Sequence, residues 1–510
     1  MLNTSLVVFL QLGAIAILAL YVAANLGAND VANSMGTSVG SKALTLRQAI
    51  IVAGILEFAG AVLFGQGVSE TLATGVVNEE MFAAKPQVFL IGMVSVLAAC
   101  GLWLQIATSL GLPVSSSHAV VGAIAGFSWV AAGIHAVDWP TIGRISLTWV
   151  ATPFASGALA ALFYSGVKHW ILDRPDPLFQ LREWIPWLSA ALLSVFGIIV
   201  LPSVVDVALV QTGAIDFARD RFGWNLPIHD IAIAIGSIAA IGLSLNSWKK
   251  LEKEEGRGKK EEGRRKKEEG RGKKEEGRGK REEGRGKREE GRGKREEGRG
   301  KKEEGSLTTD FVTDFTGVTD RKNKQEEIFS PSPPLPLRHS SIEQQMARFQ
   351  VLSACFVAFA HGSNDVGNAV APLAAIVYIQ RTGSFPLEDF NVPLWILVLG
   401  GAGIVIGLAI WGQKVIATVG ENIIKLEPSG GFCAELATAT TVLLASRLGL
   451  PVSTSHALVG AVVGVGLIKG WKSVRWKTLQ SIGSAWVVTI PIAAGLGASI
   501  FSIAQWILVK

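Results

Sequence analysis

The chain has 510 residues, a formal net charge of +6 and 49% hydrophobic residues, with a mean hydropathy of +0.38. Between Lys249 and Glu304 lie 25 Lys and Arg residues and 17 Asp and Glu residues, and the rest of the chain has few charges. About one-tenth of that remainder is charged, against roughly a quarter in a soluble domain, which excludes an ordinary soluble enzyme. The composition predicts a membrane-embedded body with one charged insert.

Apolar stretches that are long enough to cross a membrane recur along the chain, since a helical span needs about 20 apolar residues. They lie at 5–26, 46–65, 87–109, 115–134, 145–167, 184–209, 227–248, 346–380, 393–413, 430–447, 453–468 and 478–506. The pattern predicts an all-α integral membrane protein with about twelve transmembrane segments. Two of them, 430–447 and 453–468, are short enough to be half-spans.

A charged loop, residues 249–345, separates the two groups of spans. From Lys266 to Gly305 it repeats KKEEGRG or KREEGRG every seven residues. The heptad has no apolar position, and two glycines per repeat cost a helix roughly 2 kcal/mol, so disorder is favoured over a coiled coil. Its Lys and Arg residues predict a cytoplasmic location. A solvated tether is favoured over a site for nucleic acid or lipid headgroups, so no nucleic-acid partner is expected.

Two polar motifs each occur twice. Residues 27–33 read GANDVAN and residues 362–368 read GSNDVGN, with five of seven residues identical. Residues 110–122 read LGLPVSSSHAVVG and residues 448–460 read LGLPVSTSHALVG, with eleven of thirteen identical. Because the motifs come in the same order in both halves, two multi-helix units correspond.

The two units begin an odd number of predicted spans apart, so they cross the membrane in opposite directions. This inverted-repeat plan is typical of secondary transporters, whose binding site lies near the midplane between the repeats. One span more or fewer would make the repeat parallel. The chain therefore divides into a first transmembrane repeat at 1–170, connecting transmembrane helices at 171–248, the charged loop, and a second repeat at 346–510.

Asp30 and Asp365 lie within apolar stretches, each between two asparagines. A carboxylate at the bilayer centre costs about 3 kcal/mol and needs a partner. Glycines flank both motifs and Pro372 follows the second, which predicts broken helices with freed carbonyls at the midplane. Carboxylate, amide and carbonyl oxygens suit a hard cation such as Na⁺, here at Asp30 and Asp365 with Asn33 and Asn368. The alternative is a polar pair that only links two helices.

Hydroxyl side chains begin the apolar stretch that follows each Pro-Val dipeptide. Serine and threonine at a helix start are typical capping residues, and the free amides of the first turn favour an anion. Two such helix starts facing each other predict a site for one tetrahedral oxyanion, with simple capping as the alternative. The hydroxyls are those of Ser115, Ser116, Ser117, Ser453, Thr454 and Ser455.

His118 and His456 directly follow these hydroxyls. Adjacent residues on a helix point about 100° apart, so Ser117 and His118 form a poor nucleophile and base. Structural hydrogen bonding is the favoured role, and proton transfer stays open because histidine titrates near neutrality. Glu57 and Glu435 are two further acids within apolar stretches, and each is expected to face the interior and to bind a cation or a donor.

Taken together, these residues resemble the inorganic phosphate transporter family over about residues 10–170 and 345–510. The matching stretches are GANDVANS at 27–34, HGSNDVGNAVAP at 361–372, GLPVSSSH at 111–118, GLPVSTSH at 449–456, ILEFAG around Glu57 and GFCAEL around Glu435. The charged loop has no counterpart in this resemblance.

The resemblance implies import of inorganic phosphate by Na⁺ or H⁺ symport, two inverted repeats and a homodimer in the lipid of the plasma or inner membrane. It implies no enzyme activity and no cofactor beyond the coupling ion. The implied substrate ligands are Asn29, Asp30, Ser115, Ser116, Ser117, Asn364, Asp365, Ser453, Thr454 and Ser455. The implied cation and coupling residues are Asp30, Asn33, Asp365, Asn368, Glu57 and Glu435.

Several alternatives stay open at this point. A sulfate permease of the same fold would bind an anion of the same shape, although sulfate has no hydrogen to donate to a carboxylate. A membrane scaffold or receptor that acts through its basic loop is a more distant alternative. An intramembrane hydrolase lacks a well-spaced base. Residue type does not separate Na⁺ from H⁺, because both use carboxylates.

Overall fold

The computed structural model describes residues 2–110, 114–200, 337–386, 390–419, 424 and 426–508, with short stretches between 238 and 292. One compact unit, the membrane body, comprises Met1–Ser244 and Arg338–Lys510, and a second comprises Leu245–Leu337. The described residues of the second unit are short helical stretches. Most of the charged loop and of the predicted span 227–248 lies outside the described residues, so disorder and a cytoplasmic location stay predictions. The predicted end of the loop at residue 345 is wrong, because residues 338–345 already belong to the helix α12 (Leu337–Thr382).

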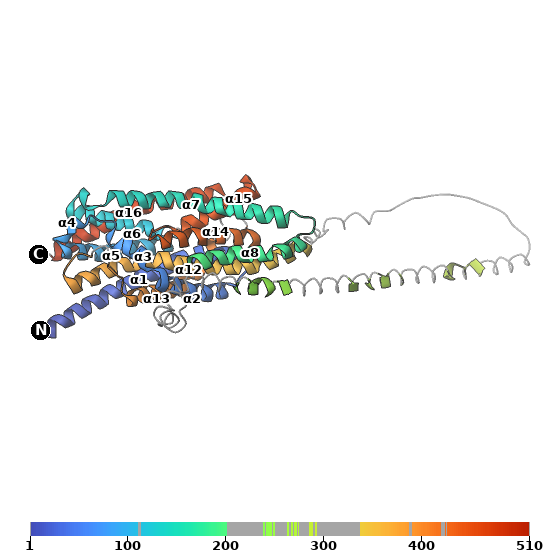
Figure 1. Ribbon diagram of the computed structural model, residues 1–510, viewed down its shortest axis with the longest axis horizontal. Coiled ribbons are helices and arrows are strands. Elements are labelled where there is room, and N and C mark those ends of the chain that lie inside the picture. The colour runs from blue at the N-terminus through green and yellow to red at the C-terminus, as the bar shows by residue number, and fades with distance from the viewer. Residues whose placement is uncertain are drawn as a thin grey trace, which may run out of the picture. The chain divides into compact units, whose positions relative to one another are not determined.

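The membrane body is built from helices, and its described residues contain only an isolated bridge between Val77 and Val137 besides them. The first half contains α1 (Leu2–Gly40), α2 (Leu46–Phe64), α3 (Gln66–Thr74), α4 (Glu79–Ala83), α5 (Pro86–Ser109), α6 (Ser116–Ala132), α7 (Trp139–Val167) and α8 (Pro177–Ile199). The second half contains α12 (Leu337–Thr382), α13 (Leu394–Val419), α14 (Pro428–Arg447), α15 (Thr454–Lys469) and α16 (Trp476–Leu508). Most of the long helices run along a common direction (Figure 1).

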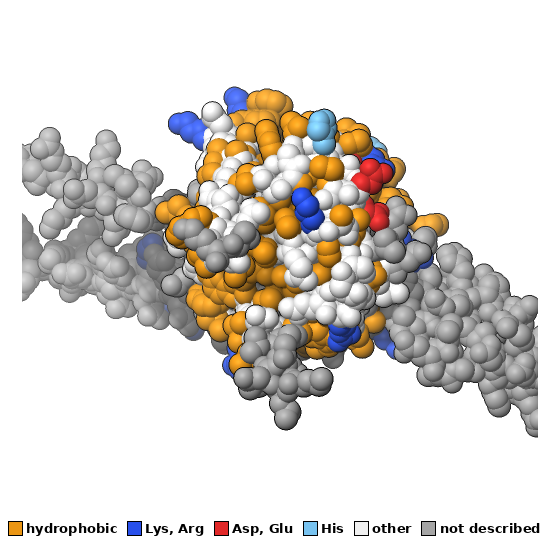
Figure 2. Space-filling view, turned by 90° about the vertical axis from the view of Figure 1, so that its left-hand side faces the viewer, with side chains coloured by type: hydrophobic (Ala, Val, Ile, Leu, Met, Phe, Trp, Pro, Cys, Tyr) orange, Lys and Arg blue, Asp and Glu red, His pale blue; other side chains and the backbone are white. Residues whose placement is uncertain are grey.

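Six of the described helices are long and apolar enough to cross a membrane: Phe9–Gly40, Leu46–Phe64, Pro86–Ser109, Trp139–Leu172, Leu394–Gly412 and Trp476–Leu508. The helices α6 and α15 are apolar but have only 17 and 16 residues, which is short for a span. The helical membrane fold is therefore confirmed, and the total of twelve spans stays a prediction. At one end of the body, charged side chains are few and scattered among hydrophobic ones (Figure 2).

The predicted helix break at the two Asn-Asp motifs is wrong. The helix α1 is continuous from Leu2 to Gly40, and α12 is continuous through Pro372. The chain instead interrupts its helices before the hydroxyl motifs, between α5 and α6 and between α14 and α15. The physical reason is close helix packing, because the motif glycines let a neighbouring backbone approach α1 and α12 without a break in either helix.

The motif glycines serve close helix packing. A Cβ atom on Gly27 would overlap the backbone carbonyl of Ile404 on α13, and one on Gly362 would overlap that of Glu57 on α2. Glycine at such a crossing lets two backbones approach without a side chain between them. The first Asn-Asp helix thus packs on a helix of the second half, and the second Asn-Asp helix packs on a helix of the first half.

Each of the two helices that begin with a hydroxyl motif also packs on a helix of the other half of the chain. Gly126 on α6 faces the backbone of Ala494 on α16, and Gly464 on α15 faces the backbone of Gly157 on α7. Both halves therefore contribute to each packing unit. This packing between the halves brings the four polar motifs into contact with one another inside the body. The inversion of the two whole units remains a prediction.

Candidate functional site

The two aspartates each hold a hydroxyl from their own half of the chain. Ser116 Oγ donates to Asp30 Oδ2 at 3.1 Å, and Thr454 Oγ1 donates to Asp365 Oδ2 at 2.8 Å. All four side chains are buried. The repeated sequence motifs therefore produce a repeated contact, in which an Asn-Asp helix touches the start of a short helix.

Two asparagines make the corresponding contact across the halves. Asn33 Nδ2 donates to Ser455 Oγ at 2.7 Å, and Asn368 Nδ2 donates to Ser117 Oγ at 3.3 Å. Asn368 Nδ2 also lies 3.2 Å from Ser116 Oγ. Aspartate thus binds the hydroxyl of its own repeat, and asparagine binds that of the other repeat. The starts of α6 and α15 are held face to face.

The remaining asparagines anchor the helix pair that precedes the hydroxyl motifs. Asn29 Nδ2 donates to Thr108 Oγ1 at 2.9 Å on α5, and Asn364 Nδ2 donates to Ser446 Oγ at 3.1 Å on α14. These amide nitrogens point into neighbouring helices. The amide oxygen of Asn364 is buried and has no hydrogen-bond partner among the described residues.

Ser115 and Ser453 act as helix N-caps. Each serine accepts a hydrogen bond from the backbone N–H of the histidine three residues later, at 3.4 Å in both cases. Capping at these positions leaves the next two hydroxyls of each motif in the first helical turn. All three hydroxyls of each motif were predicted to bind the anion, whereas in the structure one of them caps the helix and the other two face other site residues.

Several buried oxygens at the site have no hydrogen-bond donor among the described residues: Asn364 Oδ1, Asp365 Oδ1 and Asn368 Oδ1. Pro372 lies inside α12 and has no N–H, so the backbone carbonyl of Asn368 loses its helical donor. Buried acceptors without donors are costly unless a cation or a hydrogen-bond donor binds to them. The oxygens fit Na⁺, which prefers carboxylate, amide and carbonyl ligands.

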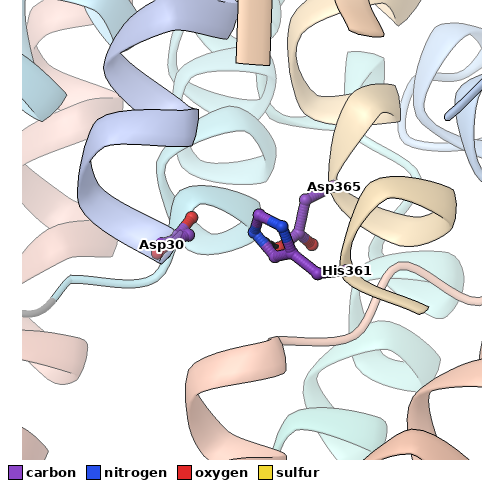
Figure 3. Close-up of side chains that lie close together, drawn as sticks. All are labelled: Asp30, His361 and Asp365. Carbon is purple, nitrogen blue, oxygen red and sulfur yellow. Dashed lines mark ion pairs between the residues drawn. The ribbon is translucent and has the colours of Figure 1, made fainter. Parts of the chain in front are cut away.

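His361 connects the site to Glu57 and is not among the predicted site residues. Its Nε2 lies 2.9 Å from Asp365 Oδ2, and its Nδ1 lies 3.2 Å from Glu57 Oε1. These are ion pairs by distance, without aligned hydrogen-bond angles. Figure 3 shows the ring between Asp30 on α1 and Asp365 on α12, and ligand atoms of these three residues lie within 4.8 Å of one another.

The signal for His361 was present in the sequence, because a lone histidine directly precedes the second Asn-Asp motif. The internal repeat does not reveal this histidine, because it has no identical residue in the first half. Leu26 occupies the corresponding position in the first half. Glu57 is buried and also accepts a hydrogen bond from Ser34 Oγ at 2.8 Å, as expected for an acid that faces the interior.

Glu435 forms a second buried cluster, away from the aspartates. Its carboxylate accepts from Thr37 Oγ1 at 2.5 Å, Ser38 Oγ at 2.7 Å, Gln350 Nε2 at 3.2 Å and Ser353 Oγ at 2.7 Å. Four donors from α1 and α12 thus surround one carboxylate. None of these four donors was identified from the sequence, because they lie outside the repeated motifs.

The Glu435 cluster also shows how α1 and α12 are oriented. Moving forward along α1 from Asp30 leads to Ser38, and moving backward along α12 from Asp365 leads to Ser353. Both serines reach the same carboxylate. The two Asn-Asp helices therefore run in opposite directions.

The two histidines of the hydroxyl motifs link helices through backbone oxygens. His456 Nδ1 lies 2.9 Å from the backbone oxygen of Trp149, which Pro153 on α7 deprives of its helical donor. His118 Nδ1 lies 3.1 Å from the backbone oxygen of Trp486 on α16. The hydroxyl of Ser117 donates to the backbone of Val452, not to His118. The geometry supports helix linkage rather than a nucleophile and base.

Comparison with known proteins adds an independent finding to this geometry. Residues 26–497 match the phosphate transporter family. The chain belongs to this family. Inorganic phosphate transporter 2-1, chloroplastic, from Arabidopsis thaliana is 36% identical over 492 residues, which cover 96% of this chain and 71% of that protein.

Two further relatives of this phosphate transporter family member agree. A putative phosphate permease of Haemophilus influenzae is 33% identical, and the match covers 96% of both chains. A solved structure of a sodium-dependent phosphate transporter is 31% identical with a TM-score of 0.72, and covers 97% of this chain and 99% of that one. The family is one of transporters, and the sulfate alternative is not favoured.

Proposed function

We propose that the protein imports inorganic phosphate by symport with Na⁺. The observation that carries this proposal is the meeting of the two short-helix starts with two aspartates in one buried place. The positive ends of the two helices favour an anion, and the carboxylates of the two aspartates favour cations, so one site can hold both. The name of the solved relative supports Na⁺ over H⁺ as the coupling ion.

Phosphate is proposed to bind between the starts of α6 and α15. The unpaired amides of a first helical turn carry a partial positive charge and favour an oxyanion. The proposed hydroxyl ligands are Ser116, Ser117, Thr454 and Ser455, which already lie within hydrogen-bond distance of the Asn-Asp motifs. Asn29 and Asn364 are proposed to contribute amide oxygens, and Ser115 and Ser453 to hold the helix starts as caps.

Na⁺ is proposed to bind at Asp30 and Asp365, with the amide oxygens of Asn33 and Asn368. The oxygen of Asn368 and one oxygen of Asp365 are buried and have no donor in the described structure. Glu435 is proposed as a further coupling residue, because a buried carboxylate with several hydroxyl neighbours has the ligand chemistry of a cation site. No cofactor besides the coupling ion is required.

Coupling follows from mutual charge compensation at the site. A buried phosphate near two carboxylates is unfavourable without cations, and the cations gain from the phosphate charge. Each ligand therefore raises the affinity for the other, and this reciprocal effect is what a symporter needs. Movement of the repeats relative to each other would then expose the filled site to the opposite side.

Phosphate is favoured over sulfate by the buried acceptors. A protonated phosphate oxygen donates a hydrogen bond, which the donor-free oxygens of Asn364 and Asp365 can accept. Sulfate at neutral pH carries no hydrogen to donate. An anion without a hydrogen to donate would leave these buried acceptors unpaired, and this costs more affinity than a poor fit in an apolar pocket does.

The proposal is tested by uptake of labelled phosphate into proteoliposomes that hold the purified chain. We expect an inward Na⁺ gradient to drive accumulation, whereas an inward H⁺ gradient of equal size has little effect. Excess sulfate should leave the rate unchanged. Accumulation of labelled sulfate without phosphate uptake would overturn the substrate, and uptake that follows only the H⁺ gradient would overturn the ion.

The charged loop is expected to be dispensable for transport. Deleting residues 249–305 should leave sodium-driven uptake per inserted protein unchanged, because every proposed ligand lies outside this segment. Deletion of the transmembrane helix α5 (Pro86–Ser109) serves as the control for misfolding. A deleted chain that inserts normally but loses uptake would instead support the scaffold or receptor alternative.

We further propose a homodimer in the lipid of the plasma or inner membrane, with the charged loop in the cytoplasm. The multi-pass architecture and the Lys and Arg residues near the spans support this orientation. Cysteine labelling from either side of a right-side-out vesicle, at a cysteine introduced into the loop, tests the orientation. Cross-linking in the same vesicles tests the dimer.

A further inference from the structure

The two halves of the site correspond position by position. The backbone carbonyl of Ile404 faces Gly27, and that of Glu57 faces Gly362. Because Gly27 and Gly362 occupy the same place in the two Asn-Asp motifs, Ile404 is the structural counterpart of Glu57. The residues that precede the two glycines correspond as well, so Leu26 is the counterpart of His361.

At these counterpart positions the two halves differ in chemistry. The second Asn-Asp motif has a polar chain that leads from Asp365 through His361 to Glu57, with ion-pair distances of 2.9 and 3.2 Å. The first motif has Leu26 and Ile404 instead, and both are completely buried. The repeated architecture therefore has an ionisable pair at this place in one half and an apolar pair in the other.

This difference shows that the repeated packing arrangement does not by itself require polar residues at these positions. Burying a carboxylate and an imidazole costs free energy that a leucine and an isoleucine do not cost, and well-packed apolar residues often replace buried ion pairs without loss of stability. The counterpart pair shows that such packing is sterically possible in this fold. What the pair touches at the site is the carboxylate of Asp365, which His361 Nε2 approaches to 2.9 Å.

The two aspartates are held in different ways. Asp30 receives hydrogen bonds from Ser116 at 3.1 Å and Asn33 at 3.2 Å, which are neutral donors. Asp365 receives one from Thr454 and in addition lies against the ring of His361. Second partners of this kind orient ligands and tune their affinity for a metal ion, typically by 10- to 100-fold when removed.

We propose that His361, held in place by Glu57, is a positioning residue that fixes the carboxylate of Asp365 and makes the two cation half-sites unequal. The carboxylate of Asp365 is in direct contact with His361 at 2.9 Å, whereas the hydrogen bonds to Asp30 come from the neutral donors Ser116 and Asn33. This inference rests on the proposed sodium and phosphate symport and assigns a role to a pair within its site.

The experiment compares half-saturation for Na⁺, half-saturation for phosphate and maximal uptake rate in proteoliposomes. His361→Gln is expected to raise the Na⁺ concentration for half-maximal uptake by about tenfold or more, because glutamine cannot bridge both carboxylates. Glu57→Gln should give a shift in the same direction. The double variant H361Q/E57Q should be no worse than the more impaired single variant, because the two residues act as one unit.

The counterpart positions provide the matched controls. Leu26→Met and Ile404→Leu change packing at the corresponding places of the first half and should leave both half-saturation values unchanged. A second double variant, H361L/E57I, copies the first half and should fold with a thermal midpoint close to that of the wild type. If it fails to fold, the glutamine variants still decide the question.

The outcomes separate this inference from the proposed function. Wild-type vesicles without sodium-driven phosphate uptake would overturn the symport itself. Normal wild-type uptake with an unchanged Na⁺ half-saturation in His361→Gln would overturn only the role of His361. A lower thermal midpoint in His361→Gln with unchanged half-saturation values would assign the pair a structural role and likewise overturn the inference.

Discussion

Replacing Asp30 with asparagine is expected to lower sodium-driven phosphate uptake by about 100-fold or more, because an interaction with an ionised group contributes up to about 3 kcal/mol. Asparagine has the size of aspartate and keeps one side-chain oxygen, so it retains one of the two hydrogen bonds that Asp30 accepts, from Ser116 at Oδ2 and from Asn33 at Oδ1. The chain should therefore insert and fold normally. What is lost is the negative charge that compensates a bound cation, and with it the coupling between Na⁺ and phosphate.

The measurement is uptake of labelled phosphate per inserted protein, with and without an inward Na⁺ gradient. Asp138→Asn is the matched control, because Asp138 caps α7 by accepting from the backbone N–H of Thr141, and asparagine caps a helix equally well. The control should transport normally. Wild-type rates in the Asp30→Asn vesicles would remove the aspartate from the transport site.

Gly27→Ala is expected to destabilise the folded membrane body by about 1–3 kcal/mol, the usual cost of overpacking. An added Cβ atom would overlap the backbone carbonyl of Ile404, and backbone cannot move aside as a flexible side chain can. The helices α1 and α13 would have to separate along their shared face. The thermal midpoint of the purified protein in detergent, followed by size-exclusion chromatography, should fall.

The same helix supplies the control for this prediction. Gly13 also lies on α1, and an added Cβ atom there meets no atom within 4 Å. Gly13→Ala should keep or slightly raise the thermal midpoint, since alanine favours a helix over glycine by roughly 1 kcal/mol. Equal midpoints for the two variants would show that the crossing of α1 and α13 tolerates a side chain at this position.

Much of the site could be predicted because it recurs. The Asn-Asp motif and the hydroxyl motif each occur twice and in the same order, which identifies the corresponding residues even though about two-thirds of the chain separates the copies. The structure places Asp30 next to Ser116 and Asp365 next to Thr454, so the predicted groups do meet. The ion and phosphate ligands among them stay proposals.

The predicted helix break failed for a physical reason. Glycine and asparagine are compatible with a broken helix, and they are equally compatible with a continuous helix that packs closely on another. The choice depends on whether a neighbouring backbone fills the space next to the glycine. Only the position of Ile404 against Gly27 decides this, and the two residues lie far apart in the chain.

The amino-acid sequence by itself determined the membrane class, the two-fold repetition and the residue types of the site, because hydropathy, motif order and charge are properties of the chain. Only the tertiary structure decided which side chains touch. The bridge from Glu57 through His361 to Asp365 and the four donors around Glu435 join residues from different helices. Such contacts depend on how helices pack, and packing is set by the fit of whole surfaces rather than by a local pattern of residues.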